Sequence, residues 1–257
     1  MLLILFVLQF LTTVWWIVLQ TFPSHSTIWN FVYNGVYGLV FLYGGIVGSA
    51  FGTKLGGWKS SIGRATILIS SGLLFYGIGQ FVWMYYNMYL HNNVPYPSLA
   101  DLFFILLSPL VGLGFWYILS MYRTFISRRL IIELFITLIV IGSINIIFVT
   151  RPDLSNEVGL WGKVLNIYYP LSDSLLASLA FITFRTGGGK FEKSILLFSA
   201  GMLLMSTADT LFTFRNNTGA YWNGDITDLL FALGGFTLSW GIIRTLESFV
   251  KVDPVKT

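Results

Sequence analysis

The chain has no cysteine and only two histidines, so few of its residues suit redox, metal or nucleophilic chemistry. Without cysteine there can be no disulfide, thiolate metal site or cysteine nucleophile. His25 and His91 both lie between hydrophobic runs, where they cannot be axial haem ligands inside a helix bundle. No nucleophile–base pair stands out. We therefore expect a protein that is not an enzyme and that holds no cofactor and no metal.

Charge is scarce as well, because charged residues make up only 10% of the chain and hydrophobic residues make up 55%. Ordinary soluble domains contain roughly 25% charged residues, so most of this chain must face lipid or a dry interior. The net charge of +4 is scattered over short loops and is no nucleic-acid-binding surface. Every lysine lies in a loop or at the end of a hydrophobic run, which excludes a retinal Schiff base.

Eight hydrophobic runs dominate the sequence, and each is about long enough to cross a bilayer. Lipid offers the backbone no hydrogen bonds, so these runs should be helices and not open strands. The first run lacks a basic start and a cleavage signal, and we interpret it as a retained helix. The fold class is thus an all-α, polytopic integral membrane protein. The predicted helices are 2–21, 28–52, 65–90, 99–122, 130–150, 162–186, 193–215 and 225–246.

The lysines and arginines predict which way the helices cross the membrane. Twelve of the fifteen fall on one side of the eight-helix arrangement, and only Arg151, Lys163 and Arg215 remain for the other. Basic residues stay cytoplasmic during insertion, so we expect a multi-pass protein of the cell membrane with both termini cytoplasmic. The twelve are Lys54, Lys59, Arg64, Arg123, Arg128, Arg129, Arg185, Lys190, Lys193, Arg244, Lys251 and Lys256.

Tyrosine and tryptophan gather near the opposite, outer ends of the predicted helices. Rings of this kind favour the membrane interface, so the simplest interpretation is an aromatic belt. The residues concerned are Trp29, Trp83, Tyr85, Tyr86, Tyr89, Tyr96, Trp161, Tyr221 and Trp222.

The single membrane domain (1–257) divides into two similar halves, about 1–122 and about 130–246, followed by a short tail, 247–257. Each half contains an even number of spans, so the halves should insert the same way up as a parallel repeat. Chance similarity between leucine-rich segments is the alternative. The matched polar positions are Asn30 with Asn166, Tyr33 with Tyr169, Tyr37 with Asp173, Gln80 with Asp209, and Asp101 with Asp228.

Several predicted helices carry polar side chains, and two of these are carboxylates. An ionisable group in hydrocarbon is costly and usually faces the bundle interior. Asp173 lies about eleven residues into its helix, near mid-membrane. We expect a polar cavity that opens to the outside, with Asp173 and Asp209 at its centre; helix-to-helix hydrogen bonding is the alternative. The candidate ligand-binding residues are Asp173, Asp209, Gln80, Tyr169, Asn166, Tyr37, Tyr33 and Trp83.

Four further polar residues mark two predicted helix starts. Ser98-x-x-Asp101 and Asp225-x-x-Asp228 both have the spacing of a capping box. Each would satisfy free N–H groups at the helix start, and a carboxylate suits the positive end of the helix dipole. We interpret them as caps that could also form the rim of the cavity.

Two short segments resemble the multi-helix membrane sensor regions that precede microbial diguanylate cyclase (GGDEF) or histidine kinase domains. The first is Val94-Pro95-Tyr96-Pro97-Ser98-Leu99-Ala100-Asp101-Leu102-Phe103-Phe104, and the second is Tyr169-Pro170-Leu171-Ser172-Asp173-Ser174-Leu175-Leu176. The resemblance covers roughly residues 65–246 and implies a sensor. Those regions feed a cytoplasmic output domain, whereas the tail after Glu247 is too short to fold alone.

The favoured hypothesis is therefore a non-enzymatic membrane sensor or ligand-binding protein. A small molecule or cation would enter from outside, and a separate cytoplasmic signalling protein would carry the signal onward. A small-solute or cation transporter and a structural subunit of a membrane complex remain alternatives. A transporter needs a path to both faces, and the cytoplasmic halves of the helices offer mainly hydroxyl groups, which argues against a pore.

Overall fold

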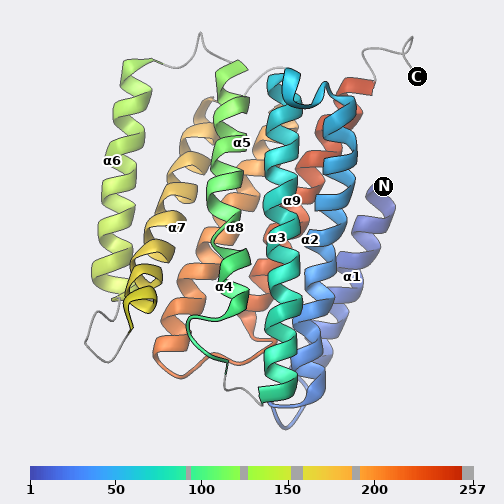
Figure 1. Cartoon of the computed structure of the whole chain (residues 1–257), viewed down its shortest axis with the longest axis vertical. Helices are drawn as coiled ribbons and strands as arrows, with labels where there is room; N and C mark the ends of the chain where they lie inside the picture. Colours follow the sequence, from blue (N-terminus) through green and yellow to red (C-terminus); the bar gives the residue numbers. More distant parts are fainter. Residues whose placement is uncertain (91–93, 122–126, 152–158, 187–191, 251–257) are drawn as a thin grey trace.

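The computed structural model describes residues 1–90, 94–121, 127–151, 159–186 and 192–250, and each regular element in these ranges is helical. Eight spans, counting α4 and α5 together, are long and apolar enough to cross a membrane, as the sequence predicts. Figure 1 shows them running up and down the bundle. The helices are α1 (Leu2–Leu19), α2 (Ile28–Lys54), η1 (Gly57–Lys59), α3 (Ser61–Leu90), α4 (Leu99–Phe104), α5 (Leu107–Met121), α6 (Arg128–Ile144), η3 (Asn145–Thr150), α7 (Leu160–Thr186), α8 (Glu192–Asn217) and α9 (Ile226–Val250).

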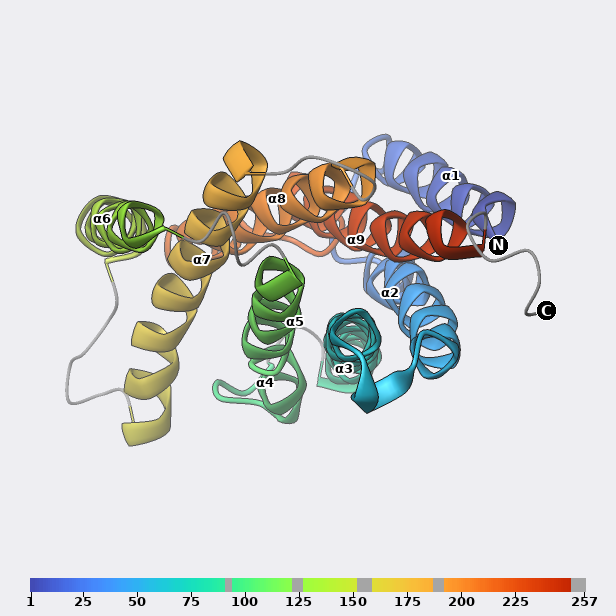
Figure 2. The same cartoon turned by 90° about the horizontal axis from the view of Figure 1, so that it is seen from above.

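Most of the helices form a closed ring when the bundle is viewed from above (Figure 2). Each of α2, α3, α5, α7, α8 and α9 contacts the next, and α9 contacts α2 again. α1 packs outside the ring against α2 and α9, whereas α6 packs outside it against α7. The outer helices expose apolar side chains such as Phe10 and Phe135, as expected of surfaces that meet lipid.

Glycines allow the ring helices to approach one another closely. A Cβ atom on Gly44 of α2 would lie 1.8 Å from the hydroxyl of Ser239 on α9. A Cβ atom on Gly235 of α9 would lie 2.5 Å from the ring of Phe41 on α2. Small residues at such crossings let helix backbones pack tightly inside membranes, so α2 and α9 are held firmly against each other on this side of the ring.

The single helix predicted over 99–122 is wrong in one respect, because α4 and α5 are separated by a break at residues 105–106. Pro109 has no N–H with which to bond the carbonyl of Ile105, four residues earlier, and its ring crowds that carbonyl. The hydroxyl of Tyr168 on α7 donates to the Ile105 carbonyl at 2.5 Å. The Ile105 carbonyl, which lacks its helical donor because of Pro109, therefore links the break between α4 and α5 to α7.

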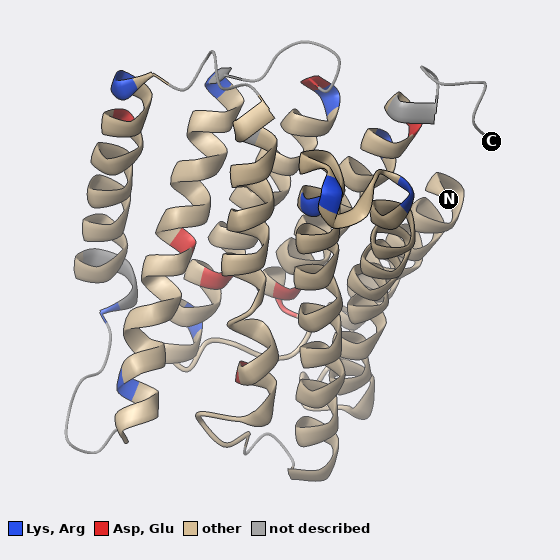
Figure 3. Cartoon of the chain, turned by 45° about the horizontal axis from the view of Figure 1, so that its top comes forward, with Lys and Arg blue, Asp and Glu red and all other residues tan. Residues whose placement is uncertain are grey.

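Basic residues gather at one end of the bundle (Figure 3). They stand at the α2–α3 connection, at the start of α6, at the facing ends of α7 and α8, and late in α9. Arg151, Lys163 and Arg215 lie at the ends of helices on the opposite side. Arg123, Lys190, Lys251 and Lys256 lie outside the described residues.

Candidate functional site

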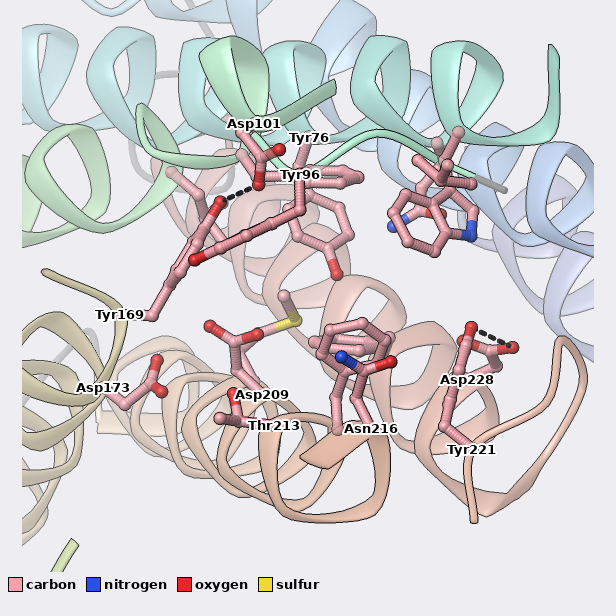
Figure 4. A pocket seen from close by; sticks show the side chains of 18 of the residues that line it. Tyr76, Tyr96, Asp101, Tyr169, Asp173, Asp209, Thr213, Asn216, Tyr221 and Asp228 are labelled. Atoms are coloured by element: carbon pink, nitrogen blue, oxygen red, sulfur yellow. Dashed lines mark hydrogen bonds between the residues drawn. The ribbon is translucent and has the colours of Figure 1, made fainter. Parts of the chain in front are cut away.

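A cavity of about 590 Å³ lies inside the helix ring, toward the end opposite the basic residues. Its wall is built by α2, α3, α4, α5, α7, α8 and α9, together with parts of the α1–α2, α3–α4 and α8–α9 connections. Volumes of roughly 300–1,000 Å³ are typical of small-molecule sites. Polar side chains from helices far apart in the sequence therefore meet in one place (Figure 4).

Asp173 and Asp209 lie side by side on one wall of the cavity (Figure 4). Asp173 is only 3% exposed, and its Oδ2 atom has no hydrogen-bond partner. α7 continues through Pro170, whose carbonyl accepts a hydrogen bond from Ser174 at 2.6 Å. The hydroxyl of Ser206 on α8 donates to the backbone carbonyl of Asp173 at 2.8 Å, which fixes the two helices at this level. The protein thus holds a buried carboxyl oxygen at the cavity without supplying a donor for it.

Asp101 uses its two carboxyl oxygens for two different purposes. Oδ2 accepts from the backbone N–H of Ser98 at 2.7 Å and from its hydroxyl at 2.9 Å, as the capping-box spacing predicts. Oδ1 accepts from the hydroxyl of Tyr169 on α7 at 2.6 Å (Figure 4). The helix cap therefore also forms part of the cavity wall.

Asp228 is the centre of a second group on the other side of the cavity. Its Oδ2 accepts from the backbone N–H of Gly224 at 2.6 Å, and both of its oxygens lie 3.3 Å from the hydroxyl of Tyr221. The hydroxyl of Tyr37 lies 2.7 Å from Oε1 of Gln80 and 3.4 Å from Oδ1 of Asp228. Burial, with the nearby Asp228 carboxyl adding to it, raises the pKa of Tyr221 well above its ordinary value. The Tyr221 hydroxyl therefore stays protonated and acts as a donor.

Asn223, in the loop before α9, joins three elements above the Asp228 group. Its Oδ1 accepts from Asn34 at 2.6 Å and from the indole N–H of Trp83 at 3.0 Å. Its Nδ2 donates to Asn87 at 3.0 Å, and its backbone carbonyl accepts from Asn30 at 3.1 Å. This network ties the loop to α2 and α3.

Of the candidate ligand-binding residues, Tyr33 alone does not line the cavity. It is fully buried between the helices, and its hydroxyl has no partner. It lies one helical turn before Tyr37, which does reach the wall. The candidates that the cavity brings together are Asp173, Asp209, Gln80, Tyr169, Asn166, Tyr37 and Trp83.

Only two of the four predicted cap and rim residues line the cavity, namely Asp101 and Asp228. Ser98 is turned toward Asp101 in the capping interaction. Asp225 caps α9, because its Oδ1 accepts from the backbone N–H and the hydroxyl of Thr227. Its Oδ2 forms a 2.6 Å ion pair with Arg215, so the whole carboxyl is occupied away from the cavity.

Several lining residues were not among the sequence candidates. Tyr96 and Tyr221 carry the aromatic-belt interpretation in the sequence, yet both side chains reach into the cavity. Tyr96 donates to Oδ1 of Asn166 at 2.6 Å across the space between the α3–α4 loop and α7. In the sequence, both tyrosines lie five to seven residues before an aspartate near the start of a helix, and this spacing is the one signal that distinguishes them from the other belt residues. The residues missed include Tyr76, Tyr96, Tyr168, Tyr221 and Asn223.

Acidic side chains outnumber basic ones in the cavity wall. Four aspartates line it, whereas none of the described lining residues is lysine or arginine. His25 lines the wall and stacks on Trp222 with ring centroids 3.9 Å apart, and His91 lies outside the described residues. Within the described ranges no three His, Cys, Asp or Glu side chains are grouped as metal ligands would be. Comparison with protein-family models, curated proteins and solved structures gives no match, so the interpretation depends on this geometry.

Proposed function

We propose that the chain is a non-enzymatic membrane sensor that binds a small ligand in this cavity. The observation that carries the proposal is the Oδ2 atom of Asp173, which is buried and unpartnered at the wall of a 590 Å³ cavity. A buried carboxyl oxygen without a hydrogen-bond donor lowers the stability of the folded protein. A ligand that donates a hydrogen bond to this oxygen would offset that cost and explain why the residue is present.

The cavity opens to the outside and both termini are cytoplasmic. Support comes from the basic residues, which gather at one end of the bundle (Figure 3), whereas the residues that line the cavity lie toward the other end of the helices. Lysine and arginine are enriched in cytoplasmic loops. The protein is a multi-pass protein of the cell membrane in this orientation.

The two halves are parallel repeats that both contribute to the cavity. Tyr169 of the second half donates to Asp101 of the first, and the hydroxyl of Tyr37 of the first half approaches Asp228 of the second. These are reciprocal contacts between sequence-matched helices. Each half thus supplies a helix-start aspartate and a tyrosine that reaches the aspartate of the other half.

A second pair of contacts supports the same symmetry. Asn30 of α2 donates to the carbonyl of Asn223, while Asn166 of α7 accepts from Tyr96. Asn30 and Asn166 are matched positions in the two halves, and Tyr96 and Asn223 each precede their helix-start aspartate by five positions. In the first pair Tyr37 lies one helical turn after Tyr33, the sequence match of Tyr169, whereas in the second pair the residues stand at matched positions; both pairs support the repeat over chance similarity.

Packing below the cavity supports sensing over transport. Phe115 of α5 and Phe198 of α8 meet edge to face with centroids 5.6 Å apart, and both are buried. Met202, one turn nearer the cavity, is also fully buried. A dense apolar layer therefore separates the acidic pair from the basic end, and binding is transmitted by movement of helices.

A ligand would move the helices on the α5–α7 side of the ring. Three tyrosine hydroxyls, those of Tyr96, Tyr168 and Tyr169, bridge α7 to the α3–α4 loop, to the break between α4 and α5, and to α4. A ligand at Asp173 lies beside these bridges and changes their geometry. The altered spacing of α5 and α7 is then read at the cytoplasmic end by a separate signalling protein, as the resemblance to sensor regions implies.

The natural absence of cysteine provides a direct test. Thr213→Cys lies at the cavity, one turn from Asp209, and should react with a membrane-impermeant maleimide in intact cells. Ser199→Cys, on the same helix but fully buried in the basic half, is the matched control and should stay unlabelled. Labelling of neither variant from outside, or labelling of both, would contradict an outward cavity closed at its base.

A further inference from the structure

We infer that the cavity takes a small organic ammonium ion with an apolar body. The inference rests on the proposed function and specifies its ligand class. It follows from three features of the wall: an adjacent pair of carboxyls with an unsatisfied oxygen, the aromatic rings that line the same cavity, and the absence of a third metal-ligating group among the described residues.

The four carboxyls of the wall differ in how many hydrogen-bond donors the protein supplies to them. Asp101 and Asp228 already accept hydrogen bonds from backbone and tyrosine donors. Asp173 is nine-tenths or more buried, and its Oδ2 accepts no hydrogen bond from the described residues. The side-chain partner of Asp209 is the adjacent Asp173 carboxyl itself. Two adjacent carboxyls whose partner is each other leave acceptor oxygens for a ligand rich in N–H groups, and their acidic character favours a cation.

The described lining residues include no permanently charged cation to meet this charge. No lysine or arginine is among the described lining residues, and Arg215 is committed to Asp225 and to the carbonyl of Ala220. An anionic ligand would therefore bring a further negative charge into a wall that contains four aspartates. Like charges that approach in a low-dielectric site repel strongly, so anionic ligands are disfavoured.

Aromatic rings line the same cavity as the acidic pair. Trp83 and Phe212 meet edge to face at 6.2 Å, and Phe212 meets Tyr221 at 4.7 Å. Tyr76 packs against Phe231 with centroids 5.7 Å apart on the adjoining wall. Ring faces attract ammonium groups, and aromatic cages bind organic cations in preference to neutral molecules. The same rings offer apolar surface to the body of the ligand.

A metal ion fits this wall less well. Ca²⁺ takes six to eight oxygen ligands and Mg²⁺ prefers octahedral oxygen coordination, whereas only Asp173 and Asp209 present adjacent carboxyls without donors. In the described ranges no grouping of three or more metal-ligating side chains occurs. A volume of about 590 Å³ is also far larger than a bare ion needs. An ammonium group with a carbon skeleton fills it.

The test compares two probes that differ in one group, phenethylamine and 2-phenylethanol, on the purified full-length protein in nanodiscs. Phenethylamine should raise the thermal midpoint in a concentration-dependent way, since a ligand that binds the folded state stabilises it. The neutral alcohol should need at least tenfold higher concentration for the same shift. NaCl and CaCl₂ are tested at matched ionic strength.

Variants then assign the effect to the acidic pair. The shift should vanish in Asp173→Asn and in Asp209→Asn, and it should persist in Glu133→Gln, whose carboxyl pairs with Arg129 and Arg185 at the basic end. Should either aspartate variant fail to fold, protection of Thr213→Cys from maleimide by phenethylamine provides a second measurement in the otherwise native chain.

Each unfavourable outcome is decisive for the ligand class. An equal response to the alcohol, a shift that survives both aspartate substitutions, or a shift produced only by Na⁺ or Ca²⁺ would overturn the ammonium assignment. No shift and no protection by the amine would overturn it as well. Labelling of Thr213→Cys from outside without amine protection would leave the outward cavity standing, so failure of this inference is distinguishable from failure of the proposed function.

Discussion

Tyr169 on α7 donates its hydroxyl to Oδ1 of Asp101 at the start of α4 over 2.6 Å. The contact joins residues 68 positions apart and crosses the cavity between the two halves of the chain. The other oxygen of Asp101 caps α4 through Ser98. One carboxyl therefore sets both the start of a helix and the distance between two helices of the ring.

Tyr169→Phe should lower stability by about 1–3 kcal/mol, because it leaves an oxygen of a largely buried carboxyl without its donor. Tyr85→Phe is the matched control, since Tyr85 is 55% exposed and its hydroxyl has no partner among the described residues. The measurement is equilibrium unfolding in mixed micelles. Equal stabilities of the two variants would show that the Tyr169 contact contributes nothing to the fold.

Asp173→Asn and Asp228→Asn should have opposite effects on stability, although both remove one carboxyl from the cavity wall. Asp173 has an oxygen without a partner, so loss of its charge should leave the thermal midpoint unchanged or raise it. Asp228 accepts hydrogen bonds from Gly224, Tyr221 and Tyr37. An asparagine there would place its own N–H groups against these donors, which should lower stability by about 1–3 kcal/mol. A larger loss in Asp173→Asn would mean that this carboxyl is structural.

Gly44→Ala should destabilise the protein by about 1–3 kcal/mol, because the new methyl group would overlap the side chain of Ser239 across the α2–α9 contact. Gly112→Ala is the control, since its Cβ would lie 3.7 Å from Leu179, an ordinary contact. The double variant Gly44→Ala/Ser239→Gly should recover much of the loss. Thermal unfolding of the three proteins measures this, and no recovery would place the strain elsewhere.

The helices were predictable because hydrophobic length alone determines which segments can cross lipid. Asp173 and Asp209 were predictable for a related reason, since ionisable groups in a span are costly and turn inward. The division of the 99–122 span into two helices was not predictable, because Pro109 could equally have kinked a continuous helix. The break depends on Tyr168, which satisfies the freed carbonyl from a helix far away in the sequence.

The remaining residues of the cavity depend on how the loops fold back, which periodicity does not report. Tyr96 and Tyr221 lie in loops, where the sequence indicates only an interfacial aromatic ring. Their hydroxyls reach inward because Asn166 and Asp228 accept from them. Asp225 shows the reverse, because it caps α9 through Thr227 as predicted, but its other oxygen pairs with Arg215 and not with the cavity, and Asp228 accepts from Gly224 and not from the N–H of Asp225.

Arg215→Ala should be strongly destabilising, by about 3–5 kcal/mol, because it leaves the carboxyl of Asp225, whose side chain is only 2% exposed, without its charged partner. Arg129→Ala is a control with the same chemistry at the other end of the bundle. The side chain of Arg129 is 85% exposed, so loss of its pair with Glu133 should change stability by no more than about 1 kcal/mol. Raising the salt concentration should weaken the Arg129 pair and leave the Arg215 pair nearly unaffected. Unfolding of both variants at low and high salt measures the difference, and similar small losses in the two would mean that water reaches Asp225 and that the start of α9 is less enclosed than its contacts indicate.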